Sequence, residues 1–92
     1  MLLDVREQHE WDAGHAPQAV HIAMSELSGR ARELPADRTI VCICHTGGRS
    51  AVVTDALNNG GWHALDLLGG MDAWRLEGLP VVRDDGSPGA VI

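Results

Sequence analysis

The stretch CHTGGRS, residues 44–50, carries the residue types and spacing that are best suited to chemistry in this chain. It directly follows the apolar run TIVCI, so a buried strand would deliver Cys44 into a glycine-bearing loop. Gly47 and Gly48 allow the backbone to turn tightly, since glycine accepts positive φ angles. The amide N–H groups of a loop that leads into a helix point at one spot and favour an anion there. The pattern therefore predicts a site for a sulfur anion at Cys44.

Ionisation decides whether such a cysteine is reactive, because the thiolate is the nucleophilic form. An unperturbed cysteine with a pKa of about 8.5 is only about 3% ionised at pH 7. Lowering that pKa by about two units would make Cys44 mostly thiolate, which corresponds to roughly 2.7 kcal/mol of differential stabilisation. We therefore expect Cys44 to be the nucleophile. Cys42 lies within the apolar run and is expected to be a core residue.

Strands and helices are predicted to alternate around this loop. Apolar and β-branched runs indicate strands, and helical spacing between turn residues indicates helices. Ser25 would cap the start of the helix expected over 26–34, and Pro35 would end it. The expected strands are 2–5, 39–43 and 62–70, with a short extended piece in 15–22, and the expected helices are 7–14, 26–34, 50–61 and 71–78. This alternation predicts a parallel sheet with helices on both faces. Active residues of such folds collect at the carboxyl ends of strands, which is where Cys44 lies.

The composition indicates one small acidic domain. The chain has 92 residues and a net charge of −6, with seven basic and thirteen acidic side chains, which argues against nucleic acid and anionic membranes as partners. No apolar stretch approaches ~20 residues, and the first ten residues do not resemble a signal peptide. Two cysteines one residue apart form no disulfide framework, so a reduced cytoplasmic setting is expected.

Five segments, in order, resemble the motifs of the rhodanese domain, a sulfurtransferase family. They are LLDVRE, GHAPQAVHI, CHTGGRS, GGMDAW and GLPV. The resemblance covers almost the whole chain and implies a rhodanese-like α/β domain over residues 1–82, with 83–92 as a C-terminal tail. Gln18 replaces the glycine that follows the family's proline. Family members usually have a helix and often a strand before the first of these motifs, so the resemblance also leaves open a fragment, a sheet lacking an edge element, or a fused or partner domain that supplies it.

The resemblance implies that Cys44 takes a sulfane sulfur from a donor such as thiosulfate and passes it to cyanide or a thiol through a persulfide. The donor-binding and persulfide-stabilising loop would be His45, Thr46, Gly47, Gly48, Arg49 and Ser50. His45 and Arg49 would help an anionic donor to approach. Asp4 and Arg6 resemble the supporting ion-pair residues of the family, and no metal or cofactor is implied.

Three other functions compete with sulfur transfer. A rhodanese-like phosphatase or an arsenate reductase also uses a loop from Cys to Arg, but typically with five intervening residues, whereas four separate Cys44 from Arg49. A non-enzymatic interaction or regulatory module would keep the fold, although such members often lose the cysteine. A zinc site is disfavoured, because the five histidines and two cysteines lack the paired spacings that zinc sites usually show.

Overall fold

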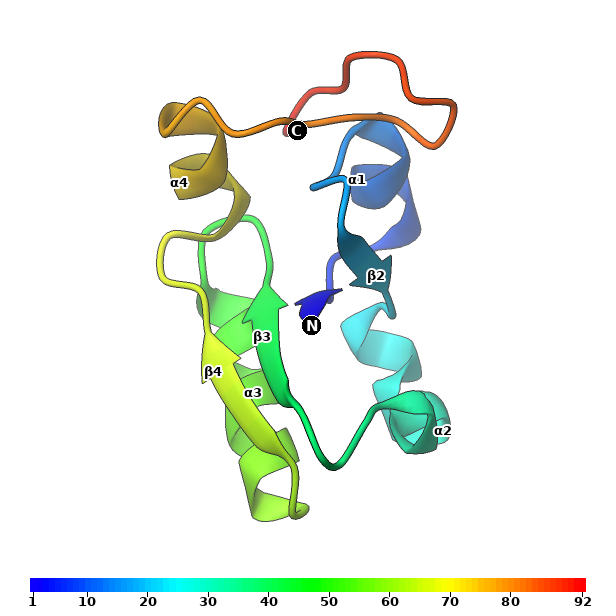
Figure 1. The fold of residues 1–92 in the computed structure, drawn as a ribbon, viewed down its shortest axis with the longest axis vertical. Coiled ribbons are helices and arrows are strands. Elements are labelled where there is room, and N and C mark those ends of the chain that lie inside the picture. Colours follow the sequence, from blue (N-terminus) through cyan, green and yellow to red (C-terminus); the bar gives the residue numbers. More distant parts are fainter.

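Four short strands form one parallel sheet in the computed structural model, which describes residues 1–92 (Figure 1). They are β1 (Leu2–Asp4), β2 (Ala19–His21), β3 (Thr39–Ile43) and β4 (His63–Asp66), arranged in the order β2-β1-β3-β4. Every pair of neighbouring strands is parallel. This confirms the predicted parallel sheet, and β3 has the bounds expected from its consecutive apolar residues.

Helices flank this sheet. They are α1 (Gln8–Ala13), α2 (Leu27–Arg30), α3 (Gly48–Asn59) and α4 (Gly70–Leu76), with short 3₁₀ helices at Met24–Glu26 and Ala31–Glu33. The connection from β1 to β2 runs across the sheet in the opposite direction to the connection from β3 to β4. Because such crossovers are right-handed, α1 and α3 lie on opposite faces of the sheet, as predicted. No helix is long and apolar enough to cross a membrane.

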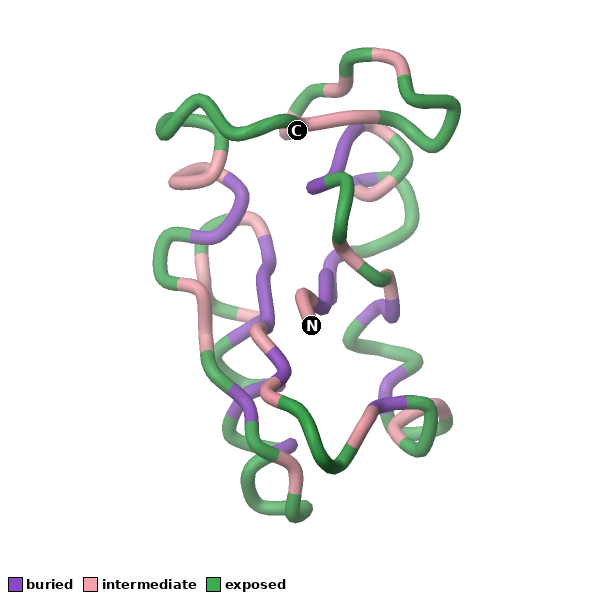
Figure 2. The backbone as a smooth tube through the Cα atoms, viewed as in Figure 1, coloured by how far each residue is buried: buried purple, intermediate pink, exposed green.

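The hydrophobic core lies between the sheet and the layer of α2 and α3. Its buried residues are Leu3, Val5, Ile22, Leu27, Leu34, Ile40, Cys42, Cys44, Val53, Leu57 and Ala64. The burial continues from β3 into Cys44 and then ends, and Figure 2 shows the loop after β3 as intermediate and exposed. Cys42 is completely buried, which confirms the expectation that it is a core residue. Cys44 therefore follows directly from a strand that is packed into the core.

Two predicted elements are wrong in their extent. The helix expected over 26–34 is a single α-helical turn between two 3₁₀ turns. Ser25 makes no capping hydrogen bond and Gly29 lowers the helix propensity, so little holds a longer helix together. The strand expected over 62–70 ends at Asp66, because the chain then turns and begins α4 at Gly70.

The C-terminal residues return to the helix at the start of the chain. Val82 forms antiparallel bridges with His15 and Pro88, and the amide of Ala90 donates to the carbonyl of Ala13 at 2.9 Å. Figure 1 shows this segment crossing the molecule at the end where α1 and α4 lie. The division between residues 1–82 and 83–92 stays a prediction.

Candidate active site

Cys44 stands at the carboxyl end of β3, and α3 begins four residues later at Gly48. Its Sγ atom accepts hydrogen bonds from the amides of Gly47, at 3.1 Å, and Ser50, at 3.3 Å. The Ser50 hydroxyl oxygen also lies 3.3 Å from the sulfur. Gly47 has a φ of 125°, a region that favours glycine, and this turn aims the amides back at the cysteine. The predicted convergence of amide donors on Cys44 is therefore present in the structure.

The two cysteines of β3 and its loop lie in opposite electrostatic environments. Burial opposes the ionisation of Cys44, whereas hydrogen bonds from the amides of Ser50, Gly47 and Arg49 favour it, and the pKa of this thiol lies below its ordinary value. Burial raises the pKa of the Cys42 thiol, and the charge of Asp66 raises it further. Relative to a free cysteine, ionisation is therefore disfavoured at Cys42 and favoured at Cys44.

The start of α4 holds the loop that follows Cys44. The amide of Met71 donates to the carbonyl of Cys44 at 2.7 Å, and the amide of Asp72 donates to the carbonyl of His45 at 3.1 Å. The His45 imidazole also lies 3.0 Å from a carboxylate oxygen of Asp72. Gly70 has a φ of 54°, and a side chain there would collide with the carbonyl of Cys44. This close approach requires glycine.

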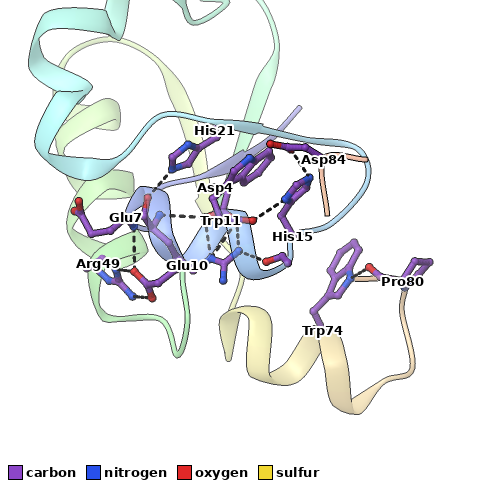
Figure 3. Close-up of polar contacts among 12 residues, drawn as sticks. Asp4, Glu7, Glu10, Trp11, His15, His21, Arg49, Trp74, Pro80 and Asp84 are labelled. Atoms are coloured by element: carbon purple, nitrogen blue, oxygen red, sulfur yellow. Dashed lines mark hydrogen bonds and ion pairs between the residues drawn. The ribbon is translucent and has the colours of Figure 1, made fainter. Parts of the chain in front are cut away.

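Arg49 binds a carboxylate of the first helix. Its guanidinium donates to both oxygens of Glu10, at 2.6 and 2.9 Å (Figure 3). The hydrogen bonds and charge of Arg49, with a hydrogen bond from the amide of Glu7, lower the pKa of Glu10 from 4.5 to about 2. The Arg49 side chain thus points towards α1. Its expected contact with an anionic donor stays a prediction.

Asp4 and Arg6 form a fully buried ion pair, as the two residue types at the end of β1 suggest. The guanidinium of Arg6 donates to both carboxylate oxygens of Asp4, at 2.8 to 3.1 Å, and to the carbonyl of Gly14 at 2.8 Å. Neither side chain hydrogen-bonds to a residue of the Cys44 loop. Their contacts instead fix the end of α1, the helix that carries Glu10.

Three residues of the site, Glu10, Asp66 and Asp72, were not predicted from the sequence. Glu10 follows Glu7 by three residues, the spacing of a capping box, and the structure contains that box. Asp66 ends the strand beside β3, where the carboxyl ends of parallel strands meet. The first signal was available in the sequence, whereas the second depends on the end of β4 at Asp66, which the expected strand over 62–70 did not show. The structure brings together no group of three or more His, Cys, Asp or Glu side chains that could hold a metal ion.

The fold and site together define an α/β domain in which a cysteine follows the carboxyl end of an inner strand of a parallel sheet and faces amide donors of the next helix. Comparison with known families matches residues 1–77 to the family described as Rhodanese-like domain. The chain belongs to this family.

Known proteins that resemble the chain include both enzymes and a regulator. It is 40% identical over 79 residues to the putative sulfurtransferase YtwF of Bacillus subtilis, covering 86% of this chain and 77% of that protein. It is 42% identical over 90 residues to the HTH-type transcriptional regulator Rv0324 of Mycobacterium tuberculosis, covering 95% of this chain but only 38% of the regulator. The crystal structure of a rhodanese-related protein from Thermoplasma volcanium superposes with a TM-score of 0.84 at 37% identity, covering 88% of this chain and 81% of that one.

Proposed function

We propose that this protein is a sulfurtransferase in which Cys44 carries the sulfur as a persulfide. The observation that supports this most strongly is the pair of amide hydrogen bonds from Gly47 and Ser50 to the Cys44 sulfur. The names of relatives add support, since YtwF is called a putative sulfurtransferase and a protein of Allochromatium vinosum, 36% identical over 87 residues, is called a sulfurtransferase.

The reaction has two steps at one sulfur atom. The Cys44 thiolate attacks the outer sulfur of a donor such as thiosulfate, the S–S bond of the donor breaks, and sulfite leaves with the bonding electron pair. Cyanide or an acceptor thiolate then attacks the outer sulfur of the persulfide, and Cys44 leaves as the thiolate. Each step begins and ends with one negative charge on the enzyme-bound sulfur.

The loop of residues 45–50 is proposed to stabilise that charge. Amide N–H groups directed at a fixed anion cost no reorganisation during the reaction, as in an oxyanion hole. His45 and Thr46 would border the approaching donor. Arg49 would hold α3 against α1 through Glu10, and its positive charge would add to the field at the sulfur. Asp4 and Arg6 are proposed to act only by supporting α1.

A regulatory module is the second candidate. It is favoured by the 42% identity with a protein named as an HTH-type transcriptional regulator, of which this chain spans less than half. The presence of both Cys44 and Arg49 favours the enzyme. The four-residue interval between them favours a single sulfur over a phosphate or arsenate group, which requires donors for three equatorial oxygens.

The proposed partners are a small sulfur donor, such as thiosulfate or a persulfide, and a thiol or cyanide acceptor. A protein acceptor is also proposed, since the chain is 36% identical over 74 residues to a Bacillus subtilis protein named as a putative sulfur carrier protein. We propose a cytoplasmic setting, because both cysteines are free and the reaction begins from a reduced thiol. No cofactor is needed for the two steps.

Matched cysteine substitutions test the proposal. Cys44→Ala is expected to abolish sulfur transfer from thiosulfate to cyanide, and Cys42→Ala is expected to keep most of it. Hydrolysis of p-nitrophenyl phosphate is expected to be negligible in all three proteins. Rapid hydrolysis of that ester without sulfur transfer would favour the phosphatase, and the absence of both activities would favour the regulatory module.

A further inference from the structure

The Ser50 hydroxyl has one proton and three neighbours that can accept it. Its oxygen lies 2.5 Å from a carboxylate oxygen of Asp66, 3.2 Å from the carbonyl of Gly47 and 3.3 Å from the Cys44 sulfur. A carbonyl, a carboxylate and a thiolate are all acceptors without a proton to share. The hydroxyl can therefore donate a good hydrogen bond to only one of them. Its orientation decides whether its proton or a lone pair of its oxygen faces the Cys44 sulfur.

Distance and charge assign the proton to Asp66. Hydrogen bonds between a hydroxyl and a carboxylate are strong and short, about 2.5–2.7 Å between the oxygens, and the separation of Ser50 and Asp66 lies in that range. When Ser50 donates to Asp66, a lone pair of its oxygen faces Cys44. That lone pair accepts the S–H of a neutral Cys44 thiol, but it repels the thiolate.

We propose that Asp66 is a positioning residue that turns the Ser50 hydroxyl away from Cys44 and so makes the thiolate less stable than the loop amides alone would make it. No direct hydrogen bond joins Asp66 to the sulfur, so the proposed route from Asp66 to Cys44 runs through the Ser50 hydroxyl. The parallel register of β3 and β4 places Asp66 beside Cys42, within reach of the first turn of α3.

The other charged groups around the sulfur are engaged elsewhere. The guanidinium of Arg49, on α3, binds Glu10 of α1. The imidazole of His45 pairs with Asp72 of α4. Cys42 on β3 favours its neutral thiol, since burial raises its pKa. Asp66 is thus the one carboxylate that hydrogen-bonds to a group touching the Cys44 sulfur.

This arrangement has a consequence that rests on the proposed function. In the persulfide, the negative charge lies on the outer sulfur, and Sγ is bonded to two atoms without a formal charge. The lone pair of Ser50 then opposes the free thiolate more than it opposes the loaded enzyme. A less stabilised thiolate is also the stronger nucleophile, because nucleophilicity falls as the thiol pKa falls. Asp66 would therefore favour loading of Cys44 with sulfur.

The pH dependence of alkylation at Cys44 tests the proposal without requiring sulfur transfer. Iodoacetamide is the probe, and the modified Cys44 peptide is quantified by mass spectrometry so that Cys42 does not contribute. In Asp66→Asn, the amide group can donate to the Ser50 oxygen and release the hydroxyl proton towards the sulfur. We expect the alkylation midpoint to fall by about one pH unit, the scale of one hydrogen bond to an anion. Asp55→Asn removes the same charge from an exposed position of α3 and should not shift the midpoint.

A double-mutant comparison separates the hydroxyl from a simple effect of charge. In a Ser50→Ala background, Asp66→Asn should no longer shift the midpoint, because the group that transmits the effect is missing. An equal shift in both backgrounds would overturn the proposal, since Asp66 would then act through its charge alone. If Asp66→Asn fails to fold, the alkylation midpoint of Ser50→Ala alone still tests the proposal. The proposal predicts a lower midpoint in Ser50→Ala, and an unchanged or higher midpoint would refute it.

Discussion

The ion pair between Glu10 and Arg49 gives the clearest test of how α1 is held to the Cys44 loop. The Glu10 side chain is only 10% exposed, and it accepts two hydrogen bonds from Arg49 and one from the amide of Glu7. Replacing Glu10 with Gln keeps the size of the side chain and one acceptor oxygen, but it removes the charge. The variant should fold, lose stability and hold the loop less firmly.

The pKa of Glu10 sets both the magnitude of this loss and its pH window. The difference between the ordinary value of 4.5 and the folded value of about 2 corresponds to about 3 kcal/mol of stabilisation of the carboxylate by folding. The Arg49 side chain is 31% exposed, so solvent screening reduces the expected effect to about 2 kcal/mol. Since the folded pKa is depressed, this stability is fully present above pH 4.5 and is lost as the pH falls towards 2.

Urea unfolding, followed by tryptophan fluorescence at several pH values, measures the effect. Glu10→Gln should be less stable than the unmodified protein at pH 7, and the difference should shrink between pH 4.5 and 2. Glu33→Gln is a matched control, because Glu33 forms a similar two-bond pair with Arg30 on the exposed surface and should change stability little. The reasoning would be refuted if Glu10→Gln had the same free energy of unfolding as the unmodified protein at pH 7 and the same loss of stability below pH 4.5.

Further predictions concern the thiol, the approach of α4 and the core. The midpoint of Cys44 alkylation by iodoacetamide should lie at a lower pH than that of a free cysteine, and a midpoint at or above about pH 8.5 would show that the loop does not activate the thiol. Gly70→Ala should disrupt the loop and lower the rate of sulfur transfer. Gly78→Ala is the control, since Gly78 also has a positive φ but has open space around it, and it should affect stability alone. An equal decrease in sulfur transfer in both variants would contradict this. Leu57→Ala should lower the free energy of unfolding, measured by chemical denaturation, by about 2–4 kcal/mol, whereas Val52→Ala, on the exposed side of α3, should lower it much less. Similar decreases in the two variants would show that the core does not lie where the structure places it.

The central strand and its cysteine could be predicted because their signals are local. A run of consecutive apolar, β-branched residues indicates a strand covered on both faces, and β3 has the expected bounds. The residue after such a strand lies at the carboxyl edge of the sheet, so the position of Cys44 followed directly. The glycines after it then required a turn, which the φ of Gly47 confirms.

The partners of the site residues could not be predicted in the same way. Glu10 and Arg49 are 39 residues apart, and their contact depends on α1 and α3 meeting at one edge of the sheet. The contact of Ser50 with Asp66 depends on the pairing of β4 with β3. The helix expected over 26–34 was wrong in its extent because its local signals are weak: Ser25 makes no capping hydrogen bond and Gly29 lowers the helix propensity.

The mass of the intact protein after incubation with thiosulfate tests the central claim most directly. The mechanism predicts that the unmodified protein gains the mass of one sulfur atom, that cyanide removes it, and that Cys42→Ala still gains it. Cys44→Ser should remain at its original mass under the same conditions. A sulfur adduct on Cys44→Ser, or none on an unmodified protein whose Cys44 is readily alkylated, would contradict the proposed persulfide at Cys44.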